Sequence, residues 1–437
     1  MKGASSSESS GRRDSLDPGV LRYRLSNGLD VILAPDPRRS SAAVNVWYHV
    51  GADHEPKGQK GIAHLAEHLM FEGSAHVGRG EHVRHLRQIG VDLLNAHTGR
   101  HRTRYLTAVL PRGLETVLWL EADRMGFLLQ GLTKEAFERE RAVVIRELRE
   151  RVDLAPYGLA RARLWQELFP ATHPYHHRIE GVARDLRELE FEDVRRFIRR
   201  WYSPSNATLV VVGSFDPTEV RKMIDRYFGT LPSKSVSSQP RVSKERLESR
   251  TVVRHHEPVA RRSAVLLGWH APPAGSKEAV IAAVTSEILA SDGQSGALHD
   301  RLVKELRLAS RVRVILSEQR AQSVFYIQAV ARRGVDEASL LAAIDETLIE
   351  LGRGALDEQE ANRALRRFST RRAALLDGSR GLPEIAERIH QRSRGLLPPS
   401  CISPEDLGAE EITRFIRESL DPRKSVAILA IPDGAAR

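Results

Sequence analysis

Two histidines and a glutamate stand at a spacing that could hold a metal ion and activate water. Within the apolar segment 61–73 the order is His64-x-x-Glu67-His68. Residues four apart lie on one face of a helix, so the two imidazoles can bind a single zinc ion. The Glu67 carboxylate lies on the adjoining part of that face, within reach of a water bound to zinc. The alternative is an amphipathic helix with two surface histidines and a solvated glutamate. The complete three-residue pattern favours the metal site.

A zinc ion of this kind needs a third protein ligand and keeps one position open for water. The best candidate segment is a predicted helix at 135–150, where Glu140 and Glu147 lie seven residues, or two turns, apart on one face. Acids at this spacing normally form a solvated helix face. Only the histidine motif makes them candidates for the third ligand.

The surrounding sequence predicts a mixture of strands and helices. Segment 20–33 predicts two strands around the turn Asn27-Gly28, and 43–50 predicts a third strand. Helical periodicity dominates 61–151, interrupted by strand-like sequence near 93–110. Further predicted elements are helical sequence at 159–201, a strand at 207–213, a strand at 264–269 and a helix at 277–289.

The end of the first half recurs at the end of the second. Segment 194–212 aligns without gaps on 412–430, an offset of 412 − 194 = 218 residues, with Pro204 on Pro422. Both copies predict an amphipathic helix, a proline break and a buried strand. We therefore predict two homologous α+β domains.

Composition and proline placement suggest how these domains are bounded. We predict a disordered leader at 1–18, an N-terminal catalytic zinc domain at 19–232, a linker at 233–249 and a homologous non-catalytic domain at 250–437. The leader has no apolar core of a secretory signal peptide. We therefore expect a cytoplasmic protein, or a periplasmic one if the true start lies upstream.

Charge and composition exclude several other classes. Lys and Arg number 67 against 57 Asp and Glu, a net charge of +10, but basic and acidic residues alternate, as at 138–141. This dispersed pattern is typical of solvated helix faces, so we expect no nucleic-acid partner. The longest apolar runs are strand-sized, so we expect no membrane span. The single cysteine, Cys401, excludes an intramolecular disulfide and a two-cysteine metal site.

Taken together, the motifs resemble the pitrilysin/insulinase family of zinc metallopeptidases, the inverzincins. The resemblance is to its short two-domain members, which include bacterial peptidases and mitochondrial processing peptidase subunits. The matching segments occur in family order along almost the whole chain: Leu25-Ser-Asn-Gly-Leu-Asp-Val, 61–73, Asn95-Ala-His-Thr98, Glu140-x-x-Val-Val-x-x-Glu147, His173-Pro-Tyr175 and Tyr202-Ser-Pro-Ser-Asn-Ala207.

The resemblance implies a role for each residue of the predicted centre. His64, His68 and Glu147 are the implied ligands of one zinc ion per chain. Glu67 is the implied general base, and Glu140 the acid that supports the site from behind. The implied function is a zinc-dependent endopeptidase acting on peptides or unfolded protein segments, with Glu67 activating a zinc-bound water. The alternative is a non-catalytic structural or assembly subunit of a paired peptidase complex.

The resemblance also implies how substrate binds. Asn95, Ala96 and Thr98 are the implied substrate-binding residues, on a strand that pairs with an extended substrate. From the sequence alone, a turn residue that satisfies local backbone groups is the favoured interpretation of Asn95. Each domain is expected to hold a mostly antiparallel sheet flanked by helices, and two chains are expected to close as a clamshell dimer.

A departure from the family pattern bears on the partner. Aligned without a gap, Val303 and Ser310 stand where the family has an arginine and a tyrosine that grip the substrate. Arg307 can substitute if the loop is shortened, but no tyrosine follows it. We therefore expect a heterodimer with a related subunit that supplies this pair. A homodimer working without the pair is the alternative.

Overall fold

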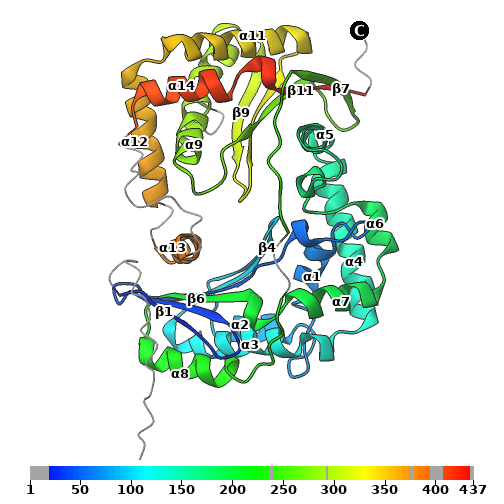
Figure 1. Cartoon of the computed structure of the whole chain (residues 1–437), viewed down its shortest axis with the longest axis vertical. Helices are drawn as coiled ribbons and strands as arrows, with labels where there is room; N and C mark the ends of the chain where they lie inside the picture. The colour runs from blue at the N-terminus through cyan, green and yellow to red at the C-terminus, as the bar shows by residue number, and fades with distance from the viewer. Residues whose placement is uncertain (1–18, 237–239, 292–293, 375–377, 394–406, 434–437) are drawn as a thin grey trace, which may run out of the picture.

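The computed structural model describes residues 19–236, 240–291, 294–374, 378–393 and 407–433. The predicted leader at 1–18 and Cys401 lie outside these residues. Each half of the chain forms one β-sheet with helices packed against it, so the fold is α+β as predicted (Figure 1).

The N-terminal half holds a six-stranded sheet in the order β1-β2-β6-β3-β5-β4. All neighbouring strands are antiparallel except β2 and β6, which are parallel. The turn between β1 and β2 contains Gly28 at φ +90°, a backbone conformation that favours glycine. The strands are β1 (Leu21–Arg24), β2 (Asp30–Pro35), β3 (Ala42–Tyr48), β4 (Leu93–Thr98), β5 (Thr103–Val109) and β6 (Ala207–Gly213).

The C-terminal half repeats this topology without the first strand. Its order is β7-β11-β8-β10-β9, and its one parallel pair, β7 with β11, corresponds to β2 with β6. The repeat seen at the ends of the two halves therefore extends over both sheets. The strands are β7 (Thr251–Glu257), β8 (Ala264–Ala271), β9 (Ala309–Ser317), β10 (Ser323–Ala331) and β11 (Val426–Pro432).

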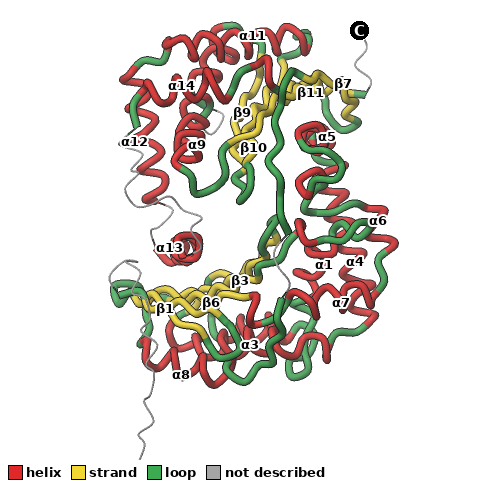
Figure 2. Tube along the Cα trace, in the orientation of Figure 1, coloured by secondary structure: helices red, strands yellow, loops and turns green. Residues whose placement is uncertain are grey.

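Helices flank both sheets (Figure 2). None of the helices in the described ranges is long and apolar enough to cross a membrane. The helices of the N-terminal half are α1 (Ile62–Leu69), α2 (Glu81–Gln88), α3 (Leu114–Gly131), α4 (Lys134–Leu148), α5 (Gly158–Leu168), α6 (Ala183–Glu188), α7 (Phe191–Trp201) and α8 (Pro217–Phe228). Those of the C-terminal half are α9 (Lys277–Leu289), α10 (Ala297–His299), α11 (Glu337–Glu350), α12 (Glu358–Ala374), α13 (Gly378–Ser393) and α14 (Ala409–Ser419).

The two halves exchange one helix each. Helix α5 packs through Leu164 on the face of the C-terminal sheet that carries Leu266 and Ile428. Helix α13 packs in the same way through Leu382 on the face of the N-terminal sheet that carries Trp47 (Figure 1). The two helices hold similar places in the repeat, since 378 − 158 = 220. Each sheet is therefore covered by its own helices on one face and by the other half's helix on the second.

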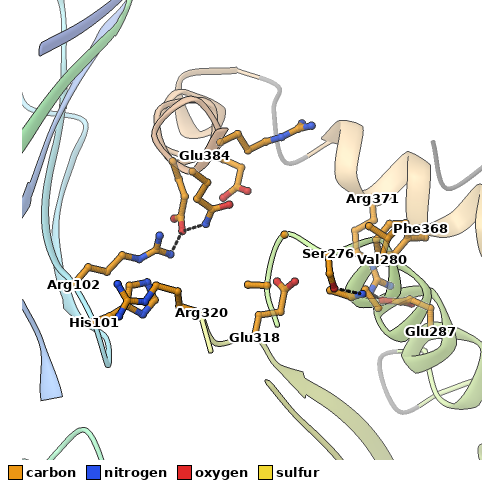
Figure 3. A pocket seen from close by; sticks show the side chains of 17 residues that line it. His101, Arg102, Ser276, Val280, Glu287, Glu318, Arg320, Phe368, Arg371 and Glu384 are labelled. Atoms are coloured by element: carbon orange, nitrogen blue, oxygen red, sulfur yellow. Dashed lines mark hydrogen bonds and ion pairs between the residues drawn. The ribbon is translucent and has the colours of Figure 1, made fainter. Parts of the chain in front are cut away.

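Charged groups reinforce this exchange and line a cavity between the halves. Glu387 of α13 pairs with Arg102, at 2.6 Å, and with Arg104 of β5. The cavity has a volume of about 470 Å³, and side chains from α9, α12 and α13 point into it opposite His101 and Arg102 (Figure 3). Acidic and basic side chains line it in equal number: Glu287, Glu318, Glu384 and Glu387 against Arg102, Arg320, Arg371 and Arg388.

The described part of the predicted linker has no helix or strand. Segment 233–249 is nevertheless held by both halves. The Ser203 hydroxyl accepts a hydrogen bond from the Lys234 amide at 3.1 Å, and the Gln322 side chain accepts one from the Glu245 amide at 2.8 Å. The described parts of the linker, 233–236 and 240–249, are therefore each attached to one of the halves.

Candidate metal centre

Helix α1 is fixed at its start by a buried carboxylate. One Glu55 oxygen accepts a hydrogen bond from the amide of Ala63, in the first turn, at 3.0 Å. The other oxygen lies 3.2 Å from Nε2 of His177. Such a carboxylate satisfies an amide that has no partner within the helix and interacts favourably with the helix dipole. Burial of Ile62, Leu65 and Leu69 then sets the rotation of α1.

That rotation turns the two histidines towards helix α4. Nε2 of His64 lies 3.8 Å from one oxygen of Glu147, and Nε2 of His68 lies 3.4 Å from the other. The three ligand atoms all lie within 4.8 Å of one another, and within the described residues this is the sole cluster of three or more potential ligands that meets that spacing. The structure therefore brings together the three residues predicted as zinc ligands.

The two candidate ligands on α4, Glu140 and Glu147, occupy different places. Glu140 contacts Nδ1 of His68 at 3.1 Å, the ring nitrogen that faces away from Glu147. A contact of this kind orients a ligand ring and leaves its other nitrogen free to bind metal. Glu147 also pairs with Arg151, one turn further along, at 2.6 Å. Of the two candidates, the geometry thus favours Glu147 as the third ligand.

The electrostatics of the histidines suit a cation. Burial and the neighbouring His68 lower the pKa of His64 to about 4, so its imidazole is neutral. Burial lowers the pKa of His68 as well, but the hydrogen bond with Glu140 and the charges of Glu147 and Glu67 outweigh it and raise the pKa above its ordinary value. A site that raises the pKa of an imidazole stabilises positive charge. Two imidazoles and a carboxylate also form a known donor set for zinc, so the residues fit that ion.

Glu67 lies beside this cluster and is held by strand β4. The Thr98 hydroxyl donates a hydrogen bond to the Glu67 carboxylate. Burial raises the pKa of Glu67, and the bond from Thr98 opposes that rise. The Thr98 hydroxyl lies 3.5 Å from the hydroxyl of Thr103, which donates to the carbonyl of Val50. The carboxylate is therefore held in one orientation, next to the predicted ligands.

The centre opens into a cavity of about 740 Å³. Strand β4 forms one wall and is an edge strand of its sheet. Asn95 is exposed, and its side chain accepts a hydrogen bond from the amide of Ala96 at 2.9 Å, the local backbone role that the sequence also allowed. All of the predicted site residues line this cavity: His64, Glu67, His68, Asn95, Ala96, Thr98, Glu140 and Glu147.

Several residues of the cavity were not predicted from the sequence. Arg151 follows Glu147 by four positions on the helix, a spacing at which an ion pair forms and which could have revealed it. Arg104 and Glu180 also line the cavity. Arg104 is paired with Glu387, nearly 300 residues away, and no local sequence signal connects them.

Comparison with known proteins identifies the family. The model described as "Insulinase (Peptidase family M16)" matches residues 30–172, and "Peptidase M16 inactive domain" matches residues 188–368. The chain is 30% identical over 343 residues to the zinc protease PqqE of Helicobacter pylori, an alignment that covers 78% of this chain and 76% of that relative. The chain belongs to the M16 peptidase family. The resemblance inferred from its motifs is thereby confirmed.

Further comparisons match half of this M16 chain in one case and nearly all of it in two others. It is 29% identical over 220 residues to the mitochondrial-processing peptidase subunit beta of Blastocladiella emersonii, over 50% of this chain and 46% of that relative. A crystal structure of a protease from Helicobacter pylori superposes with a TM-score of 0.86 at 25% identity, over 94% of this chain and 99% of that one. A chain of complex III from Candida albicans, at 14% identity, shares the fold with a TM-score of 0.74, over 94% of this chain and 95% of that one.

Val303 and Ser310, at the positions aligned with the family's arginine and tyrosine, both make contacts within the C-terminal half. Val303 packs against the core of its own half. The Ser310 hydroxyl donates to the carbonyl of Val330 at 3.2 Å. Arg307 is exposed, at φ +53°.

Proposed function

We propose that this chain is a zinc-dependent endopeptidase that hydrolyses peptides or unfolded protein segments. The observation that carries the proposal is the convergence of His64, His68 and Glu147 beside Glu67, in a cavity that strand β4 also lines. Relatives described as zinc proteases support it. One zinc ion per chain is the expected stoichiometry.

Each residue has a distinct part in this proposal. His64, His68 and Glu147 would hold the ion, which would act as a Lewis acid, lowering the pKa of water and polarising a carbonyl. Glu67 accepts the proton of the attacking water and passes it to the leaving amine. Its buried position suits this work, because a raised pKa strengthens a carboxylate as a base. Glu140 orients the ring of His68 through its contact with Nδ1.

The edge of strand β4 is the proposed docking place for the substrate. An edge strand presents unpaired amide and carbonyl groups with which an extended peptide can pair. Thr98 ends this strand and contacts Glu67, so a peptide paired along β4 passes the base. Because such pairing uses the main chain of an extended peptide, we expect the enzyme to select unfolded segments rather than a particular sequence.

The test is hydrolysis of an unstructured peptide by zinc-replete protein, compared with the Glu67→Gln variant. We expect the variant to keep its zinc and to lose about 10²–10⁴-fold in rate, because removal of a general base costs roughly this factor. Zinc is measured by elemental analysis in both proteins. Undiminished hydrolysis by a zinc-loaded variant would disprove the role of Glu67.

We further propose that the active form pairs with a related subunit. Val303 and Ser310 stand at the positions aligned with the family's substrate-gripping arginine and tyrosine, and both make contacts within their own half. Relatives described as subunits of the mitochondrial-processing peptidase support a paired assembly. The test compares the isolated chain with the chain co-expressed with a sibling that lacks the histidine motif. Full turnover by the isolated chain, as a homodimer, would refute the need for a partner.

A further inference from the structure

We propose that a second cavity, beside the metal centre, binds a carboxylate of the substrate polypeptide. This inference rests on the proposed peptidase function and adds a specificity to it. The cavity is formed by Arg151, Arg161 and Arg178, which we call the arginine pocket. Its ligand is an acidic side chain, or the carboxylate at the end of a chain.

The arginine pocket adjoins the metal cavity directly. It has a volume of about 240 Å³ and shares Arg151, Ile179 and Glu180 with the cavity of the metal centre. The opposite wall comes from the tips of β9 and β10 in the C-terminal half, including Ser317 and Tyr326. A peptide held along β4 therefore has a route from the metal centre into this pocket without leaving the protein surface.

Arg178 is the strongest sign that the pocket takes an anion. Its guanidinium is partly buried and forms no hydrogen bond or ion pair with any described residue, and Nη1 is cut off from solvent. Asp153 and Glu180 act on it only electrostatically, and burial outweighs them and lowers the pKa of Arg178. A buried donor without an acceptor is costly, so this group gains most from a ligand that accepts its hydrogen bonds.

The other arginines leave an excess of positive charge. Arg161 reaches only the carbonyl of Pro156, at 3.5 Å, and Arg151 pairs with Glu147 while most of its side chain stays exposed. Arg100, behind the pocket, donates to three backbone carbonyls at 3.1 Å, none of which carries a charge.

Glu180 is the one acidic side chain among the described residues lining the arginine pocket, against four guanidinium groups. The pocket is therefore electropositive before any ligand binds.

The local backbone holds these groups in place. Residues Arg149–Asp153 form a wide π-type turn at the end of α4, and this turn carries Arg151 out of the α-helical register. Gly158, at the start of α5, lies so close to Val152 that a Cβ would stand 2.1 Å from its carbonyl oxygen. The glycine therefore lets α5, and with it Arg161, pack against this turn.

A carboxylate matches this arrangement better than other groups. A guanidinium binds the two oxygens of a carboxylate through parallel hydrogen bonds, which add directional specificity to charge. A hydrogen bond to a charged group contributes about 1.5–3 kcal/mol, or roughly a tenfold effect or more on binding. A glutamine in the same place offers one acceptor oxygen and no negative charge, so it cannot form this paired, oppositely charged contact.

The experiment compares glutamate with glutamine in otherwise neutral peptides. One Glu is moved through each position on both sides of the scissile bond, with Gln at the same position as the reference. We expect the ratio of kcat/KM for the Glu peptide over the Gln peptide to reach about tenfold when the Glu stands within a narrow range of positions relative to the scissile bond. The ratio should fall to near one in Arg178→Gln, keep part of its size in Arg178→Lys, and persist in the control Arg146→Gln, whose side chain is exposed on α4 and lines neither cavity.

A binding measurement separates this proposal from the proposed function. Dissociation constants for the same Glu and Gln peptides are measured with the Glu67→Gln protein. This binding measurement does not depend on turnover. Tighter binding of the Glu peptide without hydrolysis by the wild type would support the arginine pocket and refute the peptidase. Hydrolysis with no Glu preference in any register would overturn the pocket alone. Peptides ending in a free acid or an amide show whether a terminal carboxylate is the ligand.

Discussion

Replacing Glu140 and Glu147 of α4 in turn by glutamine should distinguish the metal ligand from the residue that orients a ligand. Glu147 lies 3.8 Å and 3.4 Å from the Nε2 atoms of His64 and His68, whereas Glu140 touches Nδ1 of His68 at 3.1 Å. In Glu140→Gln the amide oxygen can still accept from that nitrogen, so zinc affinity should fall by about 10–100-fold. Glu147→Gln removes one of three ligands, and its loss of affinity should exceed that range.

The fold should survive both changes. Among the described residues, the only ion pair that Glu147 shares outside the histidines is with Arg151, whose side chain is 63% exposed. An exposed pair of this kind contributes about 0.2–1 kcal/mol to the free energy of unfolding. Zinc loss from Glu147→Gln would therefore report on ligation rather than on unfolding.

The assay is the zinc dissociation constant, obtained by competition with a chromogenic chelator, together with the circular dichroism of each variant. Glu150→Gln is the control, because Glu150 is exposed just beyond the end of α4 and lines no part of the centre. A weaker zinc affinity in Glu140→Gln than in Glu147→Gln would show that the two roles are exchanged and would refute the assignment.

Three further predictions follow from other contacts. Thr98→Val should reduce kcat about 10- to 100-fold with zinc retained, because the hydrogen bond that orients Glu67 is lost. Thr98→Ser should keep most of the activity, because its hydroxyl can still donate this bond. Equal rates in the two variants would contradict the prediction. Burial raises the pKa of Asp53 to about 6, so the folded state holds its proton more tightly and stability should fall as pH rises from about 4 to 6. In denaturant unfolding, the free energy of unfolding of Asp53→Asn should decrease by about 3 kcal/mol less than that of the wild type over this pH range. A pH profile identical to that of the wild type would contradict the prediction. Glu387→Gln should lower the free energy of unfolding by about 1–3 kcal/mol, because two partly buried arginines lose their partner; thermal unfolding measures it, and an unaltered midpoint would show that the pair does not join the halves.

The sequence was sufficient for features that depend on neighbouring residues. The spacing of His64, Glu67 and His68 defines one face of a helix wherever that helix packs, because the α-helical repeat is local. The helix 277–289 and the strand 207–213 were predicted with the bounds that the structure shows. Alternation and apolar periodicity along each segment carry that information.

Tertiary structure decided the features that depend on distant segments. Glu140 and Glu147 share a face of α4, and only the packing of α4 against α1 places Glu147 near both imidazoles and Glu140 behind one of them. The interval from His68, 147 − 68 = 79 residues, contains no signal for that choice.

The same limit applies to the exchange of α5 and α13 and to Arg178. The periodicity of a helix predicts that it buries an apolar face but not which sheet will cover that face. No feature of the sequence distinguishes Arg178 from the many other arginines of the chain. Arg178 lies beside the metal centre because the turn after α4, helix α5 and the C-terminal sheet pack around it. Burial and charge at a site arise from contacts between segments, so they exist only once the chain has folded.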